Sequence, residues 1–284
     1  MAALQGIKRR IRSVSGIYQI TKAQQLVAAS KLRRVQTAAL APQAYTQAAG
    51  ELLERLARNP EVRKHPLFQE RKVTSVLTIV IAGNRGMAGA YNSNVFRALG
   101  RHIKEHTSLS HSVIAVGRRA SLHVSHGREI NEIASYDITD TGVDTTVAQP
   151  VLHTMIEQFM SRKVDVVNVI YTRFISTVKQ EVAVEQLLPI VRPEGKAEVS
   201  EFEPEPEELV DVAARRVLEA KVLQAILESR ASEEAARMVA MMNATDNAGE
   251  LIGDLTLAYN NARQSNITQE LAEISAGAEA ITAQ

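Results

Sequence analysis

Three glycines between an apolar run and a helical pattern make residues 81–92 the first candidate for chemistry. Gly83, Gly86 and Gly89 could let backbone N–H groups cradle a phosphate. The spacing matches neither a dinucleotide-binding turn nor a Gly-Lys-Ser/Thr phosphate loop, and no acid ends the next predicted strand, where a ribose would lie. A tight strand-to-helix turn is therefore the preferred interpretation. A nucleotide-binding enzyme that uses the turn from Gly83 to Gly89 stays as an alternative.

Two other groups of side chains have residue types that bind metals. Asp137, Asp140 and Asp144 share one polar loop, but they lack the spacing and final glutamate of an EF-hand. His102 and His106 are four residues apart on a predicted helix and could hold zinc, yet no third ligand is evident. The chain has no cysteine, which excludes thiol catalysis and disulfides. We expect solvated residues at both places, no metal or cofactor, and no catalysis by this chain itself.

Charge is segregated along the chain, although the net charge is only +1. Residues 1–50 contain eight Lys or Arg and no Asp or Glu, whereas residues 193–208 contain seven Glu and one Lys. The basic segment has no interleaved aromatic residues and no nucleic-acid-binding motif, and an acidic protein partner or a solvated face explains it equally well without further assumption. A transit peptide is an alternative, but such a peptide needs no regular apolar repeat.

Apolar or small residues recur at steps of three and four near both ends of the chain, which predicts two long helices. The first series covers residues 7–39. The second covers residues 213–262, includes Met242 and Gly249, and passes directly from Leu227 to Ala235. We expect the closing helix to continue through residues 229–232. Helices of this length need a partner helix, and antiparallel pairing is the simplest, because one helix opens the chain and the other closes it.

The repeat of the closing helix breaks after Ala262. The next apolar residue is Ile267, and the gap between them holds only polar residues. A new series then runs to Ile281 at steps of four and three, as if the tip of the helix faced a different surface.

The segment between the two helices has the residue pattern of a β-sheet. Apolar runs typical of buried strands lie at residues 73–82, 112–117 and 165–172, with further strands near 129–133 and over 178–188. Helical patterns alternate with them at residues 91–106, 118–126 and 147–160. This order predicts a small, mostly parallel sheet with helices on its faces. The acidic, proline-containing stretch at residues 193–206 is then a linker.

Seven segments closely resemble the γ subunit of F-type ATP synthases: residues 19–23, 27–34, 84–92, 231–241, 243–248, 257–264 and 267–270. The resemblance covers essentially the whole chain. It implies an α/β plus coiled-coil fold, in which the terminal helices form an antiparallel left-handed coiled coil and flank a small, mostly parallel Rossmann-like α/β domain. The corresponding division is a coiled-coil helix at 1–58, the α/β domain at 73–192, the linker at 193–206 and a coiled-coil helix at 207–284.

The resemblance also implies a function: the non-catalytic central rotor shaft, one copy per complex, of the proton-translocating ATP synthase. Such a shaft couples rotation of the membrane c-ring to conformational changes in the catalytic α and β subunits, with the ε subunit beside its α/β domain. The complex would lie on the cytoplasmic side of a bacterial plasma membrane, with the matrix side of a mitochondrial membrane as the alternative, and the shaft would meet the membrane only through the complex. A free-standing coiled-coil scaffold is the alternative, but it does not explain the polar break at residues 263–266.

Contact residues follow from the same resemblance. The motif places four residues against a loop of one β subunit: Arg263, Gln264, Thr268 and Glu270. Five basic residues would face an acidic segment of β: Arg9, Arg12, Lys22, Lys31 and Arg33. The sign of the charge supports the second assignment independently, because the N-terminal segment has no acidic residue.

Overall fold

The computed structural model describes residues 2–40, 43–57, 62, 65–127, 130–138, 146–191 and 206–282. The chain divides into two compact units: the first combines Met1–Val27 with Met238–Gln284, and the second is Ala28–Arg237. The two longest helices, α1 (Ala2–Leu40) and α6 (Pro206–Thr282), contribute residues to both units. The predicted linker at residues 193–206 lies, except for Pro206, outside the described residues.

The first unit is a helix pair made by the N-terminal part of α1 and the C-terminal part of α6. Its buried side chains are Thr21, Met241, Thr245 and Ala248. The Thr245 hydroxyl donates a hydrogen bond to the Thr21 hydroxyl, with 2.8 Å between the oxygens. A Cβ on Gly249 would lie 3.7 Å from the Tyr18 ring. Because Tyr18 precedes Thr21 while Gly249 follows Thr245, the two helices run antiparallel in this unit.

The predicted apolar stripe of α6 is wrong at Met242, whereas Gly249 does lie against the partner helix, beside Tyr18. The structure buries Met241 and Ala248, whereas Met242 is 40% exposed and Gly249 is only partly buried. Positions 238, 241, 245, 248 and 252 follow one another at alternating steps of three and four, which is the heptad spacing of a left-handed coiled coil. The predicted series over the same stretch, at positions 238, 242, 245, 249 and 252, alternates in the same way, so spacing there does not choose between the two. Beyond position 252 the observed series keeps the alternation through 255, 259 and 262, whereas the predicted one takes two successive steps of three, from 249 to 252 and from 252 to 255.

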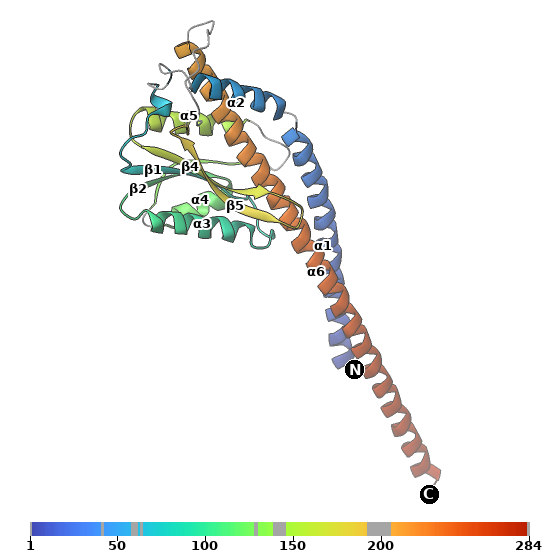
Figure 1. Cartoon of the computed structure of the whole chain (residues 1–284). Helices are drawn as coiled ribbons and strands as arrows, with labels where there is room; N and C mark the ends of the chain where they lie inside the picture. Colours follow the sequence, from blue (N-terminus) through green and yellow to red (C-terminus); the bar gives the residue numbers. More distant parts are fainter. Residues whose placement is uncertain are drawn as a thin grey trace. The chain divides into compact units, whose positions relative to one another are not determined.

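The second unit contains a five-stranded sheet with the order β3-β2-β1-β4-β5 (Figure 1). Its strands are β1 (Ser75–Ile81), β2 (Ser110–Val116), β3 (Asn131–Tyr136), β4 (Val166–Phe174) and β5 (Gln180–Leu188). The first four pair in parallel, and β5 runs antiparallel to β4. On β1, Ile79 lies in register with Ile114 of β2 and Val169 of β4. The mostly parallel sheet between long terminal helices confirms the predicted fold class.

Helices cover both faces of this sheet (Figure 1). On one face, α3 (Tyr91–Glu105) and α4 (Arg118–Ser125) pack through Val95, Leu99 and Val124. On the other face, α5 (Ala148–Met160) shares a larger core with the N-terminal part of α6. The short 3-10 helix η2 (Pro66–Phe68) adds Leu67 and Phe68 to this core.

A further helix, α2 (Gln43–Ala57), also packs on the larger core, although the sequence pattern placed this segment in the N-terminal coiled-coil helix. Leu53, Leu56 and Ala57 of α2 are buried there. Their spacing, with Leu56 three residues after Leu53, forms one apolar edge that a sheet-covering helix can bury as well as a coiled coil can.

The closing helix α6 is continuous over Pro206–Thr282, which confirms its expected continuity through residues 229–232. The polar gap at residues 263–266 does not interrupt it either. No proline follows Pro206 in the chain, so each later residue of α6 can donate its backbone N–H. Among the described residues, no helix is long and apolar enough to cross a membrane.

Candidate functional site

The carboxyl ends of β1 and β4 mark the place where this fold would be expected to bind a ligand. The chain proceeds from β1 to β2 and β3 on one side and returns to β4 on the other, so the strand order reverses between β1 and β4. Doubly wound sheets bind ligands in the crevice outside such a reversal. Here α6 occupies that place, because its side chains contact both the backbone of β4 and the turn that follows β1.

Two serines of α6 hydrogen-bond to the backbone of β4. The pairing of β4 with β1 ends at Ile170, two residues before Thr172. The Thr172 N–H donates to Ser229 Oγ at 3.2 Å, and the Thr172 carbonyl accepts from Ser232 Oγ at 3.0 Å. All three residues are buried. The helix thus satisfies backbone groups of β4 beyond the end of its pairing with β1, which would otherwise be buried without partners.

A buried ion cluster of α6 faces the glycine turn after β1. Arg237 forms ion pairs with Glu233 at 2.5 Å and with Glu234 at 2.8 Å, and both glutamates are 3% exposed. The Glu233 carboxylate lies so close to Gly83 that a Cβ on this glycine would be 2.6 Å from its oxygen. A Cβ at position 83 would therefore require the Glu233 carboxylate to shift. Ser229, Ser232, Glu233 and Arg237 are called the α6 clamp below.

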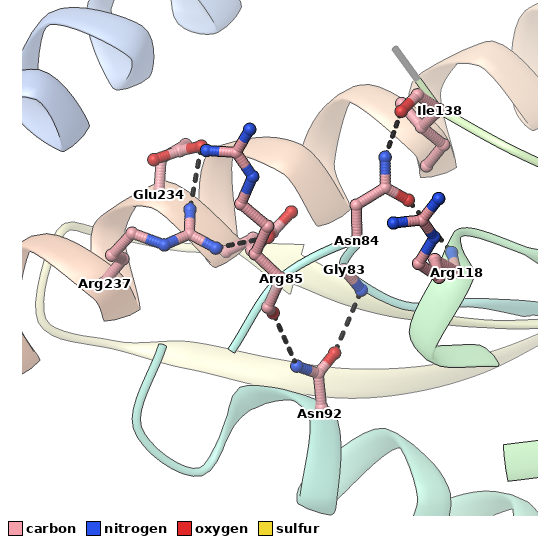
Figure 2. A network of polar contacts seen from close by, with 9 residues as sticks. Gly83, Asn84, Arg85, Asn92, Arg118, Ile138, Glu234 and Arg237 are labelled. Carbon is pink, nitrogen blue, oxygen red and sulfur yellow. Dashed lines mark hydrogen bonds and ion pairs between the residues drawn. The ribbon is translucent and has the colours of Figure 1, made fainter. Parts of the chain in front are cut away.

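The glycine turn itself is tied to the helices that follow the strands. The Asn92 side chain on α3 accepts from the Gly83 N–H at 2.9 Å and donates to the Arg85 carbonyl at 3.3 Å (Figure 2). Asn84 accepts from the Arg118 N–H at 2.9 Å at the start of α4 and donates to the carbonyl of Ile138. The turn is thus a rigid junction between β1, α3 and α4.

A second glycine is needed next to this turn, at the end of β2. Gly117 has φ of +96°, and a Cβ on it would lie 2.1 Å from the Ala82 carbonyl oxygen. Its N–H donates to the Tyr136 carbonyl at 2.8 Å. The sequence pattern does not single out Gly117, because it is an isolated glycine at the end of a predicted strand.

The electrostatics of the crevice do not suit a phosphate. Burial raises the pKa of Glu233, although the charge of Arg237 opposes that shift. Burial and the charge of Glu233 raise the pKa of Tyr91. A phosphate cradle needs free N–H groups, but the Gly83 N–H is already bonded to Asn92, and the Glu233 carboxylate lies beside the turn. This occupant favours the structural interpretation of the turn over a nucleotide-binding enzyme.

The histidine pair singled out from the sequence is joined by a third histidine. The rings of His102 and His106 on α3 have centroids 4.9 Å apart, and the His111 ring on β2 is 6.4 Å from that of His102. Burial first, and then the charges of the other two, lower the pKa of His102. Asn168 Nδ2 lies 3.2 Å from His102 Nε2. Within the described ranges, no three acidic or imidazole groups are placed to hold a metal ion.

The acidic residues singled out from the sequence lie in a loop that the structure describes only in part. Asp137 is exposed just beyond β3, and Asp140 and Asp144 lie outside the described residues. A different aspartate, Asp165, is strongly hydrogen-bonded: its carboxylate accepts from the N–H and the hydroxyl of Thr74 at 2.9 and 2.8 Å. Burial acts to raise the pKa of Asp165, but these hydrogen bonds outweigh it and hold the pKa below its usual value.

The four predicted β-contact residues are all exposed on α6 in the first unit. Successive residues of a helix are about 100° apart around its axis, so Arg263 and Glu270 share one face, and Gln264 and Thr268 share another. A single partner loop would have to cover close to half of the helix circumference to touch all four, by the same estimate of about 100° per residue. The structure thus separates the predicted contact into two pairs.

The five predicted basic contact residues are divided between the units. Arg9, Arg12 and Lys22 lie on α1 in the first unit, and Lys31 and Arg33 lie on α1 in the second. Four are exposed, and Lys31 is half-buried. None of the five pairs with an acidic group in the part of the chain that the structure describes. Their charges are therefore not neutralised by described neighbours.

The α6 clamp was missed by the sequence analysis, although one signal pointed to it. The apolar series of α6 passes from Leu227 directly to Ala235, and the skipped segment holds the serines and glutamates of the clamp. A polar interruption in a buried helical stripe indicates that another polar surface faces the helix there. The sequence does not show that this surface is the end of β4 and the turn at Gly83.

Comparisons with known proteins agree on one family. A family model described as ATP synthase matches residues 3–281. A protein named ATP synthase gamma chain from Dehalococcoides mccartyi is 41% identical over 99% of this chain and 100% of its own length. Another from Geobacter metallireducens is 39% identical over 99% of each chain. The structure also resembles the central stalk/c-ring structure of the Tetrahymena thermophila mitochondrial ATP synthase, with a TM-score of 0.62 and 25% identity over 79% of this chain and 99% of that one.

Proposed function

The chain belongs to the ATP synthase γ-chain family, and on that premise we propose that it is the central rotor shaft of a proton-translocating F-type ATP synthase. The shaft couples rotation of the c-ring to conformational changes in the catalytic α and β subunits, and it does not itself catalyse. The observation that carries the proposal is the match to a γ chain at 41% identity over 99% of this chain.

The first unit has the physical properties that a shaft requires. Two antiparallel helices bury a pair of hydroxyl groups, Thr21 and Thr245, at their interface. Each hydroxyl also bonds to a carbonyl of its own helix, so sliding of one helix along the other would cost the single hydrogen bond that joins the two hydroxyls. Towards the tip, α6 presents apolar side chains that no described residue covers: Leu257, Leu271 and Ile274 are 65%, 60% and 68% exposed. Exposed apolar residues in such a row support a surrounding protein sleeve.

The proposed partners follow from the family and the surface. The α and β subunits would surround the first unit, and the ε subunit and the c-ring would bind the second, with one copy of this chain per complex. The membrane would be contacted only through the complex, on the cytoplasmic side of a bacterial plasma membrane. Relatives from two bacteria support the bacterial location, and the likeness to the Tetrahymena central stalk/c-ring structure supports the contact with the c-ring.

Purification of the native complex tests this function directly. The mass of the intact complex should include catalytic, ε and c-ring subunits together with one copy of this chain. A chain that purifies alone from its native source, under conditions that keep the catalytic head intact, would contradict the proposal.

The contact with β is proposed to centre on Arg263 and Gln264, with Thr268 on the face of Gln264 and Glu270 on the face of Arg263 extending it. Replacing Arg263→Ala and Gln264→Ala together should weaken assembly or ATP-driven rotation, because the β loop would lose its contacts with these two exposed polar side chains. The isolated chain should keep its unfolding midpoint, since neither side chain is buried.

The matched control for this experiment is Gln269→Ala with Glu273→Ala. Among the residues that the structure describes, these exposed side chains hydrogen-bond only to each other, at 3.0 Å, on the same part of α6. The control pair should assemble and rotate normally. Equal defects in both double variants, or none in either, would contradict the assignment of Arg263 and Gln264.

A further inference from the structure

We propose that the α6 clamp fixes the rotational register of α6 within the second unit and carries the twisting load between this helix and the sheet. The inference rests on the proposed shaft function, because only a rotor subjects α6 to sustained torque. Ser229, Ser232, Glu233 and Arg237 are therefore positioning residues. They act on the helix that transmits rotation, and not on a substrate.

The clamp holds α6 from two directions. Ser229 and Ser232 are three residues apart, lie on one side of the helix, and both bond to the backbone of Thr172. Glu233 lies about 100° further around the helix axis, with its carboxylate against Gly83 at the end of β1. Rotation of α6 about its axis therefore disturbs two separate contacts, one with β4 and one with the turn after β1.

Apolar packing holds the helix against the sheet but fixes its rotation less well. Before the clamp, α6 joins the larger core through side chains such as Val210, Val222 and Ile226. Burial of such side chains is non-directional and is preserved if they repack after a small rotation. Hydrogen bonds weaken steeply as their angle departs from linear. The Ser229 and Ser232 bonds are therefore the contacts that distinguish one rotational setting from its neighbours.

The ion pairs keep the clamp in place under load. Arg237 pairs with Glu233 and Glu234 on its own helix and so holds the Glu233 carboxylate towards Gly83. Leaving either charge buried without a partner is costly, which opposes withdrawal of Glu233 from its position. On the other side of the contact, the Gly83 N–H is held by Asn92 of α3 and its carbonyl by the Arg119 N–H of α4. A force on Glu233 thus reaches both helices that cover this face of the sheet.

The test uses the assembled complex with its catalytic head immobilised. Because the chain has no cysteine, Ser108→Cys, in the exposed loop after α3, provides one attachment point for a rotation probe on the second unit. Angular fluctuations of the probe are measured without ATP. Adding Ser229→Ala and Ser232→Ala should increase the angular variance by about twofold, since both directional hydrogen bonds are lost while the contact of Glu233 remains.

Thr256→Ala is the matched control, because this hydroxyl bonds only to the Ile252 carbonyl of its own helix, at 2.7 Å. It should leave the variance unchanged. Equal variance in the clamp variant and the control would overturn the clamp, while normal ATP-driven rotation in both would leave the shaft function standing. A complex that carries Ser108→Cys alone and whose probe does not rotate with ATP would instead overturn the shaft function.

Amide hydrogen exchange provides a second measurement that does not depend on the double variant folding. In the full chain, exchange of the Thr172 amide should become about fivefold to tenfold faster in Ser229→Ala, because its hydrogen-bond acceptor is removed. Unchanged exchange at Thr172 would show that Ser229 does not hold the backbone of β4, and the clamp would be rejected.

Discussion

Gly83 is the position at which the contact between α6 and the sheet can be tested most directly. A Cβ there would lie 2.6 Å from a carboxylate oxygen of Glu233, about 0.8 Å short of ordinary van der Waals contact at 3.4 Å. The carboxylate cannot move away freely, because Arg237 holds it at 2.5 Å. Overpacking of a buried site costs about 1–3 kcal/mol, so we expect Gly83→Ala to lower the free energy of unfolding by about 2 kcal/mol.

Removing the carboxylate should remove this penalty. Glu233→Ala alone leaves Arg237 paired with Glu234 at 2.8 Å, so we expect a loss of about 1–3 kcal/mol for the missing charged hydrogen bond. In that background Gly83→Ala meets no carboxylate and should be neutral, or stabilising by about 0.4–1 kcal/mol through the unfolded state. The coupling energy between the two substitutions is then about 2 kcal/mol, within the range measured for residues in contact.

Urea unfolding of the isolated chain and its three variants, followed by circular dichroism, measures this coupling. Gly100→Ala is the matched control on α3, because a Cβ there would meet nothing within 4 Å. It should stabilise the chain by about 0.5–1 kcal/mol, as expected for alanine in place of glycine inside a helix. Additive effects of Gly83→Ala and Glu233→Ala would refute the contact. A loss of about 2 kcal/mol in Gly100→Ala would refute the explanation by steric overlap.

Three further outcomes are expected. Thr245→Val should cost about 1 kcal/mol in urea unfolding, because the hydrogen bond to Thr21 is lost. Adding Thr21→Val should cost clearly less than Thr21→Val alone, because the shared bond is already gone; additive losses would contradict this. Burial lowers the pKa of His102, so the neutral imidazole contributes to the stability of the folded chain above the usual pKa of about 6.5, and this contribution is lost as pH falls through the folded pKa. His102→Gln should therefore flatten the fall of Tm below about pH 6.5, and a Tm profile like that of the native chain would contradict this role of His102. Burial acts to raise the pKa of Asp165, but its hydrogen bonds outweigh burial and hold the pKa low. Asp165→Asn should therefore lower Tm at neutral pH and reduce the further loss of Tm in acid below about pH 3.9. A substitution that merely loosens packing would lower Tm equally at both pH values.

The fold class could be predicted from the sequence because the helical repeat near both ends of the chain differs clearly from the apolar strand runs between them. The apolar run at residues 73–82 contains β1 (Ser75–Ile81), and the run at residues 165–172 overlaps β4 (Val166–Phe174). Strands covered on both faces are apolar almost throughout, so their sequence signal does not depend on knowing which strands pair. The order of the strands in the sheet could not be predicted from these runs and comes from the structure.

The candidate site was harder to predict, because its contacts join residues that are remote in the sequence. Glu233 lies against Gly83, and Ser229 bonds to Thr172, which is 57 residues earlier in the sequence. Glutamate and serine inside a helix usually indicate an exposed face, since glutamate is rarely buried unless it is paired. Only the position of α6 at the ends of β1 and β4 shows why these polar residues are buried. The β-contact residues Arg263 and Gln264 stay predictions, because a partner surface defines them.

The position of α6 at the reversal of strand order connects the lack of a phosphate cradle with the mechanical role proposed here. In a nucleotide-binding sheet, the strand ends leave backbone N–H groups free, and a ligand satisfies them. In this chain, Asn92 satisfies the Gly83 N–H and Ser229 satisfies the Thr172 N–H. The N–H groups that could bind a ligand are thus already bonded within the chain, and the Thr172 N–H is bonded to the helix α6. Because α6 is covalently part of the chain, it cannot dissociate as a ligand can. A joint made in this way keeps its register without depending on the concentration of any small molecule, which is the property that a shaft under repeated load requires.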